Sequence, residues 1–280
     1  MRRIRVFGLT LALPMLVWQL SFFVAPLLFL VALSFWRVRN FRLEPAFTSV
    51  NWEYILASDI FWSTYSRTWM NSIVATIVTS LIAFPCAYAI SFKLQPRTRQ
   101  LAIFLLVIPF FTSYLVRIYS WQIFLTDNGI VNSLLAYAGF GPLPLINNFF
   151  GTLIGYVTLT LPLVILLQAF SLMFIDRSLI EAAHNLSCGR MRTVFTVVIP
   201  SARIGLVVAA LFCFILTFGD FVSPLYLGGG QSPTLPILIT DTTKSGQQWP
   251  RAAVIALMMI GTLLAVAFAS IAYAYRKRGR

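Results

Sequence analysis

Charged side chains are scarce in this sequence. Only 10% of its 280 residues are charged, whereas 59% are hydrophobic and 15% are aromatic. So few charges cannot cover the surface of a soluble globule of this length, and the sequence therefore predicts a surface that faces lipid. Among the charged residues the acidic ones are the fewer, with eight aspartates and glutamates against 21 lysines and arginines.

Residues that form disulfides, hold metals or cradle phosphates are also few. The three cysteines, Cys86, Cys188 and Cys213, are widely spaced and predict neither a disulfide nor a metal framework. His184 is the only histidine, so a surface position is favoured over catalysis or metal binding. The pattern G-x-x-x-x-G-K-[ST] is absent, which excludes a nucleotide site of that type. We therefore expect no catalytic residue, no metal and no cofactor.

Long apolar stretches dominate the chain instead. The first runs from Leu9 to Phe35, 27 residues without a charge, and it follows a basic start that resembles a signal peptide. About 20 apolar residues cross a bilayer as a helix, so we expect a retained signal anchor here. Glycine, proline and asparagine from Asn128 to Asn148 predict a loop inside the long fourth stretch. The sequence thus predicts an all-α polytopic membrane protein, a single transmembrane domain over residues 1–280 with six spans at about 9–35, 68–92, 101–124, 151–173, 204–222 and 252–275.

The distribution of basic residues predicts the orientation of these spans. Of the 21 lysines and arginines, 14 fall in the two termini and in the second and fourth loops, and seven fall on the opposite side. Basic loops are retained in the cytoplasm, so both termini are predicted to be cytoplasmic. Topology thereby explains the net charge of +13, and no nucleic-acid partner is needed.

The fourth loop, residues 174–203, is the longest predicted cytoplasmic segment. Its pattern predicts a short helix at Leu179–Leu186, a break at Ser187–Gly189, and a second short helix at Val194–Ile199 that leads to Pro200. The first helix carries one acidic residue, two adjacent alanines and flanking arginines. An exposed helix of this composition is typical of a docking element.

The residues Glu181-Ala182-Ala183, followed at the right distance by Val197-Val198-Ile199-Pro200, resemble the mark of one family, the binding-protein-dependent permeases of ATP-binding-cassette importers. The resemblance implies the type I importer fold and a coupling helix pair seated in a cleft of a separate ATPase subunit. Glu181 would contact a basic residue of that ATPase, although helix capping alone also explains an acid there. One departure is plain, because Ser187 stands where the family usually has glycine and Gly189 follows two residues later. The coupling residues implied are Glu181, Ala182, Ala183, Ser187, Gly189 and Pro200.

Two further segments, Leu115–Trp121 and Phe218–Pro224, are similar to permeases for spermidine and putrescine. This similarity implies import of a polyamine from the periplasm across the bacterial inner membrane. The partners implied are ATPase subunits, a second permease, a periplasmic solute-binding protein and membrane lipid. Opine, phosphonate and iron importers share part of the pattern, so these solutes are alternatives. A stand-alone secondary transporter is a further alternative, disfavoured because mid-membrane carboxylates and inverted repeats are not evident.

Two ionisable residues fall within predicted spans. Arg117 lies 16 residues after Leu101, roughly 24 Å along a continuous helix, and Asp220 lies 16 residues after Ile204, so the two are predicted at similar depth. They could form a salt bridge, or Arg117 could reach the membrane interface. Alternatively, a solute path would contain Asp220, Arg117 and the aromatic residues Tyr114, Tyr119 and Trp121, whose ring faces and carboxylate attract ammonium groups.

Overall fold

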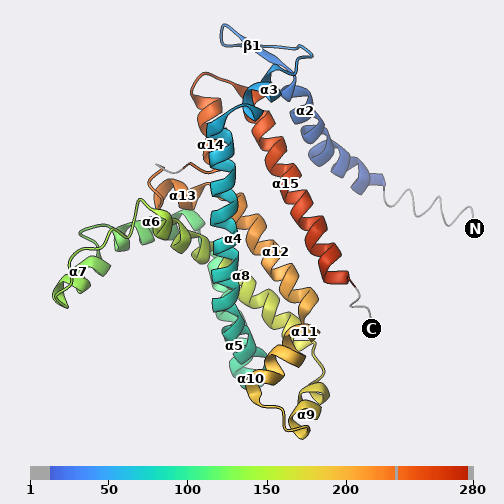
Figure 1. Cartoon of the computed structure of the whole chain (residues 1–280), viewed down its shortest axis with the longest axis vertical. Coiled ribbons are helices and arrows are strands. Elements are labelled where there is room, and N and C mark those ends of the chain that lie inside the picture. Colours follow the sequence, from blue (N-terminus) through green and yellow to red (C-terminus); the bar gives the residue numbers. More distant parts are fainter. Residues whose placement is uncertain (1–12, 231–232, 277–280) are drawn as a thin grey trace, which may run out of the picture. The chain divides into compact units, whose positions relative to one another are not determined.

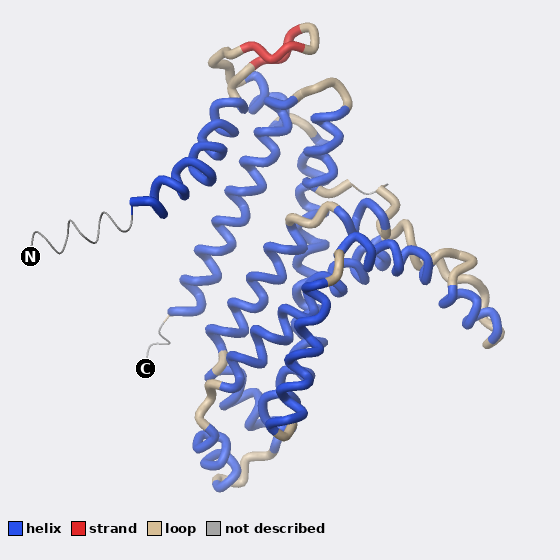
Figure 2. Tube along the Cα trace, turned by 180° about the vertical axis from the view of Figure 1, so that it is seen from behind, coloured by secondary structure: helices blue, strands red, loops and turns tan. Residues whose placement is uncertain are grey.

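The computed structural model describes residues 13–230 and 233–276, and within them the only strands form one small hairpin (Figure 2). The prediction of an all-α membrane protein is confirmed. The chain forms two compact units, Met1–Ser63 with Leu238–Gly261 and Thr64–Ile237 with Thr262–Arg280, which we call unit 1 and unit 2. The boundaries fall within three helices, α4 (Asp59–Tyr88), α14 (Leu235–Lys244) and α15 (Trp249–Tyr275).

Unit 1 begins with an apolar helix, Leu13–Ser34, which contains the π-turn η1 (Leu20–Val24) and α2 (Ala25–Ser34). Residues 9–12 of the first predicted span lie outside the described residues. A hairpin of β1 (Arg37–Arg39) and β2 (Arg42–Glu44) follows, and then α3 (Val50–Leu56). Helix α14 (Leu235–Lys244) contributes most of its length to unit 1, as α15 contributes its first half.

Unit 2 is built around three long helical segments (Figure 1). These are α4, which continues into the π-turn η2 (Ala89–Lys93), α8 (Phe149–Met173) and α12 (Arg203–Phe218). Pro85 and Pro162 lie inside α4 and α8. Proline is tolerated there because neighbouring helices can satisfy the freed backbone groups in a membrane.

The predicted span at 101–124 is not one straight helix. It consists of α5 (Pro96–Val107), the 3-10 turn η3 (Ile108–Phe111) and α6 (Tyr114–Leu125), and the chain bends by 93° at the break after Phe111. Thr112 and Ser113 are extended, which interrupts the helical hydrogen bonds and allows the bend. The segment predicted as a loop also contains a short helix, α7 (Ile130–Tyr137).

The described residues contain between four and six candidate membrane spans. Four are long and apolar enough to cross a membrane by themselves, and two bent pairs raise the number to six if each pair is one span. The single helices are Leu13–Ser34, Asp59–Lys93, Phe149–Met173 and Trp249–Tyr275; the bent pairs are Pro96–Phe111 with Tyr114–Tyr137, and Arg190–Ser201 with Arg203–Phe218.

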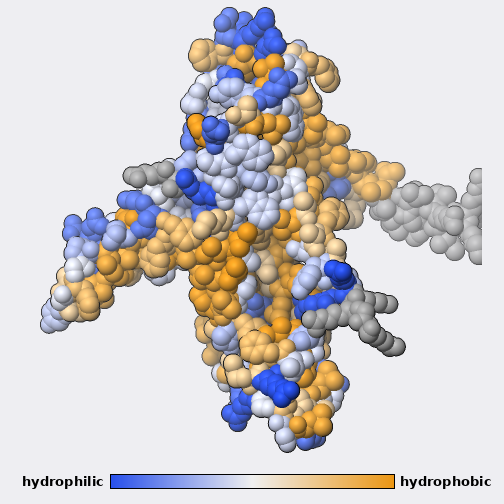
Figure 3. Space-filling model, in the orientation of Figure 1, coloured by the Kyte–Doolittle hydropathy of each residue, from blue (hydrophilic) through white to orange (hydrophobic). Residues whose placement is uncertain are grey.

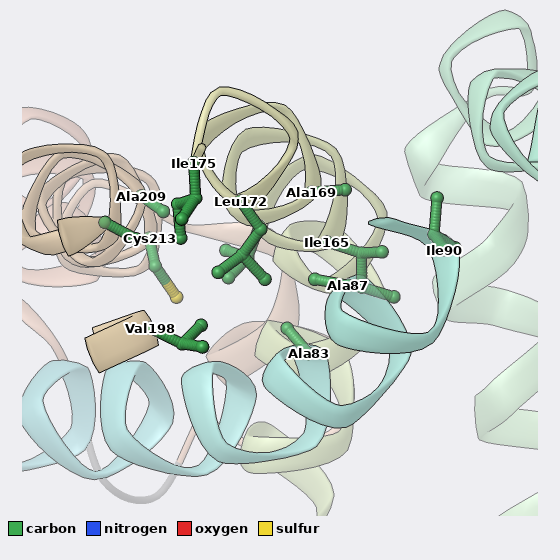
Figure 4. Close-up of a cluster of buried hydrophobic side chains, with 12 residues drawn as sticks. Ala83, Ala87, Ile90, Ile165, Ala169, Leu172, Ile175, Val198, Ala209 and Cys213 are labelled. Carbon is green, nitrogen blue, oxygen red and sulfur yellow. The ribbon is translucent and has the colours of Figure 1, made fainter. Parts of the chain in front are cut away.

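The core of unit 2 joins the ends of its long helices to the segment between α8 and α12 (Figure 4). Small residues let the helices approach closely, which is how helices pack in lipid without help from water. Val198 and Ala202, from the segment that leads into α12, are part of the same cluster. The cluster comprises Ala83, Ala87, Ile90, Val164, Ile165, Ala169, Leu172, Ile175, Val198, Ala202, Ala209 and Cys213.

Candidate functional site

The segment 174–203, here called the coupling segment, begins with a capped helix. Helix α9 (Arg177–Asn185) starts after Asp176, whose carboxylate accepts a hydrogen bond from the backbone N–H of Ser178 at 2.9 Å. This backbone hydrogen bond lowers the pKa of the Asp176 carboxyl. The cap is therefore complete at neutral pH, and its contribution is lost as the pH falls through that lowered pKa.

The turn after α9 depends on Ser187. Its backbone is left-handed, with φ +58°, and its N–H donates to the His184 carbonyl at 2.9 Å. The next N–H, of Cys188, donates to the Ala183 carbonyl at 3.0 Å, so the helix ends in the way that normally calls for glycine. Gly189 has φ −62° and instead precedes the next helix. Ser187 thus occupies the position at which the family resemblance implies glycine.

Ser187→Gly is expected to make α9 more stable. A non-glycine residue in the left-handed region costs about 1 kcal/mol, so removing the side chain should raise the protection of α9 amides against hydrogen exchange about fivefold. The measurement is hydrogen–deuterium exchange of the full-length chain in detergent. Gly189→Ala is the control, because an added Cβ there meets no atom within 4 Å. Equal protection in the wild type and in Ser187→Gly would contradict this account.

The second half of the coupling segment is one helical stretch that is longer than the short helix predicted there. It comprises α10 (Arg190–Thr193), the π-turn η4 (Val194–Val198) and α11 (Ile199–Ser201), and it bends by 77° into α12. The predicted helix Val194–Ile199 is its central part. Pro200 lies in the first turn of α11, next to the bend.

The two alanines of the first helix have different surroundings. Ala183 is buried, and α9 packs against α10 and η4, so this side chain belongs to the internal packing of the coupling segment. Ala182 and Glu181 are exposed. Exposure, which a docking surface requires, is therefore present at Ala182 and absent at Ala183. Glu181 also borders a cavity of about 210 Å³ lined by Tyr88, Phe92, Lys93, Arg177, Ile180 and Glu181.

Exposed apolar side chains lie before and after Glu181 and Ala182 along the coupling segment. Phe174 is 90% exposed and Leu186 is 84% exposed, far more than packing within one chain requires. Large apolar side chains gathered on a polar segment mark a surface that a partner covers. The exposed set is Phe174, Leu179, Leu186, Met191 and Phe195.

Arg203 is a site residue that the sequence did not single out. Its Nη2 donates to the carbonyl oxygens of Ala274 at 2.5 Å and Arg276 at 2.8 Å, and its guanidinium carbon lies 5.7 Å from the centre of the Tyr273 ring. These carbonyls lie at the end of α15, where a cation offsets the negative end of the helix dipole. Arg203 thereby joins the end of the coupling segment to the end of the last helix.

Asp220 connects α6 with α13 (Val222–Tyr226). Its carboxylate accepts hydrogen bonds from the Tyr114 hydroxyl at 2.7 Å and from the backbone N–H groups of Val222 at 2.9 Å and Ser223 at 3.2 Å. The Tyr114 hydroxyl is also hydrogen-bonded to the Ser223 hydroxyl. With only 7% of its surface exposed, Asp220 is held by internal donors.

Arg117 does not pair with Asp220. No ion pair joins the two residues, both of which the structure describes. The Arg117 Nη1 donates to the Thr158 carbonyl at 3.4 Å, and the guanidinium lies 5.8 Å from the Tyr114 ring centre. The depth deduced for Arg117 assumed a continuous helix from Leu101, and the 93° bend before α6 removes that basis.

The remaining predicted path residues are less closely associated. The Tyr119 ring lies 4.9 Å from the ring of Tyr226, whereas the Trp121 ring lies beside that of Phe124. The structure thus brings together Asp220, Tyr114 and Arg117, and it leaves Trp121 apart. Pattern reasoning also missed Tyr156, a fully buried residue whose hydroxyl has no hydrogen-bond partner in the described part of the chain.

A cavity of about 250 Å³ between α4 and the start of α8 was not foreseen either. Asn71 is 8% exposed and borders it, and within the described residues its side-chain amide makes no hydrogen bond. No sequence signal pairs Asn71 with residues almost eighty positions later. The lining residues are Arg67, Met70, Asn71, Asn148, Phe149, Thr152 and Gly228.

The sequence of this chain is similar to those of known membrane transport proteins. Residues 79–279 match the family model described as "Binding-protein-dependent transport system inner membrane component". The chain is 31% identical over 240 residues to the spermidine/putrescine transport system permease protein PotB of Haemophilus influenzae, covering 83% of this chain and 82% of the relative. It is 26% identical over 255 residues to PotB of Escherichia coli K12, covering 89% and 92%.

Solved structures show the same fold. A bacterial alginate ABC transporter in complex with an alginate pentasaccharide-bound periplasmic protein matches with a TM-score of 0.74 at 14% identity, covering 100% of this chain and 98% of that chain. The MetNI methionine ABC transporter matches with a TM-score of 0.55 at 15% identity, covering 78% and 100%. The chain therefore belongs to the family of inner membrane components of binding-protein-dependent transport systems, the permeases of ATP-binding-cassette importers.

Proposed function

We propose that this chain, as one transmembrane domain over residues 1–280, forms half of a translocation path and pairs with a second permease. We assign ATP hydrolysis to a separate ATPase subunit, and the coupling segment of this chain docks on that subunit. The apolar surface around Glu181 and Ala182 supports this docking, together with Val198 and Ala202, which tie the segment to the helix core. Movement of an attached ATPase would thus reach the long helices through packed side chains.

The proposed orientation has both termini in the cytoplasm. Its support is the concentration of 14 of the 21 basic residues on that side, since such loops are not translocated. The coupling segment then faces the ATPase subunits, and a periplasmic binding protein meets the other side. Reporter fusions at Gly141 and at the C-terminus test the arrangement, because they would report opposite sides of the membrane.

The solute we propose is a polyamine of the spermidine or putrescine type. The observation that carries this proposal is the similarity to the PotB permeases over more than four fifths of the chain. A weaker candidate is 2-aminoethylphosphonate, because a putative permease for it in Salmonella typhi is 29% identical over 133 residues, 48% of this chain. Both solutes carry an ammonium group, but only the second carries a phosphonate.

The chemistry of the candidate path fits passage rather than tight binding. The proposed path residues are Asp220, Arg117, Tyr114, Tyr119 and Trp121, to which we add the amide of Asn71. Ring faces and an amide oxygen can attract an ammonium group. However, the Asp220 carboxylate is already bonded to three internal donors, so it offers a cation little free charge. Selection of the solute is accordingly assigned to the binding protein.

The test is uptake into proteoliposomes that contain this chain, its partner permease and the ATPase subunits. With ATP inside and solute-loaded binding protein outside, we expect labelled spermidine or putrescine to accumulate, and omission of the binding protein should abolish uptake. Asn71→Leu should lower the rate at unchanged complex yield if the cavity lies on the path. Uptake of 2-aminoethylphosphonate without polyamine uptake would overturn the proposed solute while leaving the coupling mechanism in place.

A further inference from the structure

The β-hairpin of unit 1 starts almost at the end of an apolar helix. The helix Leu13–Ser34 has 22 residues, which at 1.5 Å each is about 33 Å, close to the hydrocarbon thickness of a bilayer. Only Phe35 and Trp36 separate it from the hairpin, which begins at Arg37. Two residues span at most about 7 Å, roughly the thickness of one headgroup layer, so the hairpin lies at the membrane surface.

Hydrogen bonds fix the base of the hairpin to the end of this helix. The buried Asn51 amide donates to the carbonyl oxygens of Ser34 at 2.9 Å and Trp36 at 2.7 Å. The backbone N–H of Thr48 donates to the Phe35 carbonyl at 3.0 Å. Because both ends of the hairpin are tied to the helix end, it cannot swing away from the bilayer surface.

The two faces of the hairpin differ in chemistry. Arg37 pairs with Glu44, Val38 with Leu43, and Arg39 with Arg42, so alternation puts three arginines and Glu44 on one face and two apolar residues on the other. Like charges directly opposite each other, as at Arg39 and Arg42, destabilise a hairpin. None of the three arginines forms an ion pair among the residues that the structure describes. An anion between them would remove the repulsion.

An apolar groove lies on the other face of the hairpin, where Leu43 lines it, and it extends to the tip, where Phe41 lines it next to Arg42. It has a volume of about 250 Å³ and lies within unit 1 between the last turns of the apolar helix, the hairpin and the start of α15. Phe41, at the hairpin tip, is 72% exposed and has φ +60°, a left-handed conformation that is unusual for a bulky residue. Its ring is thereby presented beside the groove. The lining residues are Phe29, Leu33, Phe41, Leu43, Gln247 and Trp249.

We propose that the hairpin and groove form a binding site for an anionic phospholipid. The phosphate lies against Arg39 and Arg42, with Arg37 close by, and the first part of an acyl chain lies in the groove. The positive charge suits the phosphate, the apolar groove suits the acyl chain, and the position at the end of a span is where a lipid headgroup lies. Hydrophilic side chains cover the hairpin beside hydrophobic ones (Figure 3), as an interfacial element requires. This site is independent of which solute is transported.

The test titrates the delipidated full-length chain in detergent with phosphatidylglycerol or phosphatidylcholine and counts bound lipids by native mass spectrometry. In Arg39→Gln with Arg42→Gln, the hairpin should keep its fold because the like-charge pair is removed, and phosphatidylglycerol should bind about tenfold more weakly. Arg97→Gln with Arg190→Gln removes two exposed charges of unit 2 and should leave binding within about twofold of wild type.

A second variant separates the groove from the charges. Phe41→Gly relieves the left-handed conformation and removes the ring, so it should reduce binding of both lipids about equally. Unchanged phosphatidylglycerol binding in the Arg39 and Arg42 variant, or an equal loss in the Arg97 and Arg190 control, would overturn the proposal. So would intact lipid binding with weakened affinity for the solute-binding protein, since the basic face would then be a protein-docking surface.

Discussion

Replacing Ala182 by arginine is expected to abolish ATP-driven uptake while leaving the chain folded and inserted. Ala182 is exposed next to Glu181 on α9, and the small side chain allows a partner surface to approach closely. Alanine and arginine both favour a helix, so α9 itself should form as before. A long charged side chain in a tight interface costs several kcal/mol when it is buried without a partner, which is enough to prevent docking.

Three measurements check this prediction in reconstituted membranes. Uptake should fall at least about tenfold, stimulation of ATP hydrolysis by loaded binding protein should disappear, and co-purification of the ATPase should weaken. Ala182→Ser is the matched control and should behave like the wild type, because serine adds one small polar atom. Ala183→Arg should instead lower the yield of folded chain, since Ala183 is buried inside the coupling segment. Normal uptake by Ala182→Arg would show that α9 docks through another face.

The second large effect is expected at the joint between α8 and α12. A Cβ added at Gly205 would collide with the Ser171 side chain, and the Ser171 hydroxyl donates to the Ala202 carbonyl at 3.3 Å. Gly205→Ala should therefore push α12 away from α8 just where the coupling segment joins α12. Overpacking of this kind costs about 1–3 kcal/mol, so the thermal unfolding temperature of the chain in detergent should fall.

The same substitution in another helix supplies the control. Gly261 lies inside α15, and an added Cβ there meets no atom within 4 Å, so Gly261→Ala should be neutral or stabilise by up to about 1 kcal/mol. Ser171→Gly should rescue Gly205→Ala, because it removes the colliding atoms. If Gly205→Ala and Gly261→Ala had the same effect on unfolding, the close approach of α8 and α12 would not be the reason for glycine at position 205.

The spans and the coupling segment could be predicted because their signals are local. Runs of about 20 apolar residues report a membrane helix regardless of what surrounds it. The Glu181-Ala182-Ala183 pattern and Pro200 lie within one segment, so their spacing can be seen without any tertiary information. The comparisons with known permeases confirm the family that this pattern indicated.

Burial within the coupling segment could not be predicted in the same way. Ala182 and Ala183 are neighbours of identical chemistry, yet one is exposed and the other is buried, because only α10 and η4 decide which side of α9 is covered. The role of Ser187 was also hidden. Its left-handed backbone follows from the way in which α9 ends, whereas the sequence placed the break only within Ser187–Gly189.

The sequence by itself determined that this chain is an α-helical membrane permease, and it predicts a cytoplasmic docking segment, because hydrophobic run length, basic-residue bias and motif spacing are properties of contiguous residues. Only the tertiary structure decided the partners of its ionisable groups. Tyr114 reaches Asp220 across 106 positions, and Arg203 reaches Arg276 across 73. Such contacts depend on a 93° bend in one segment and on close helix packing, and no local periodicity records either of them.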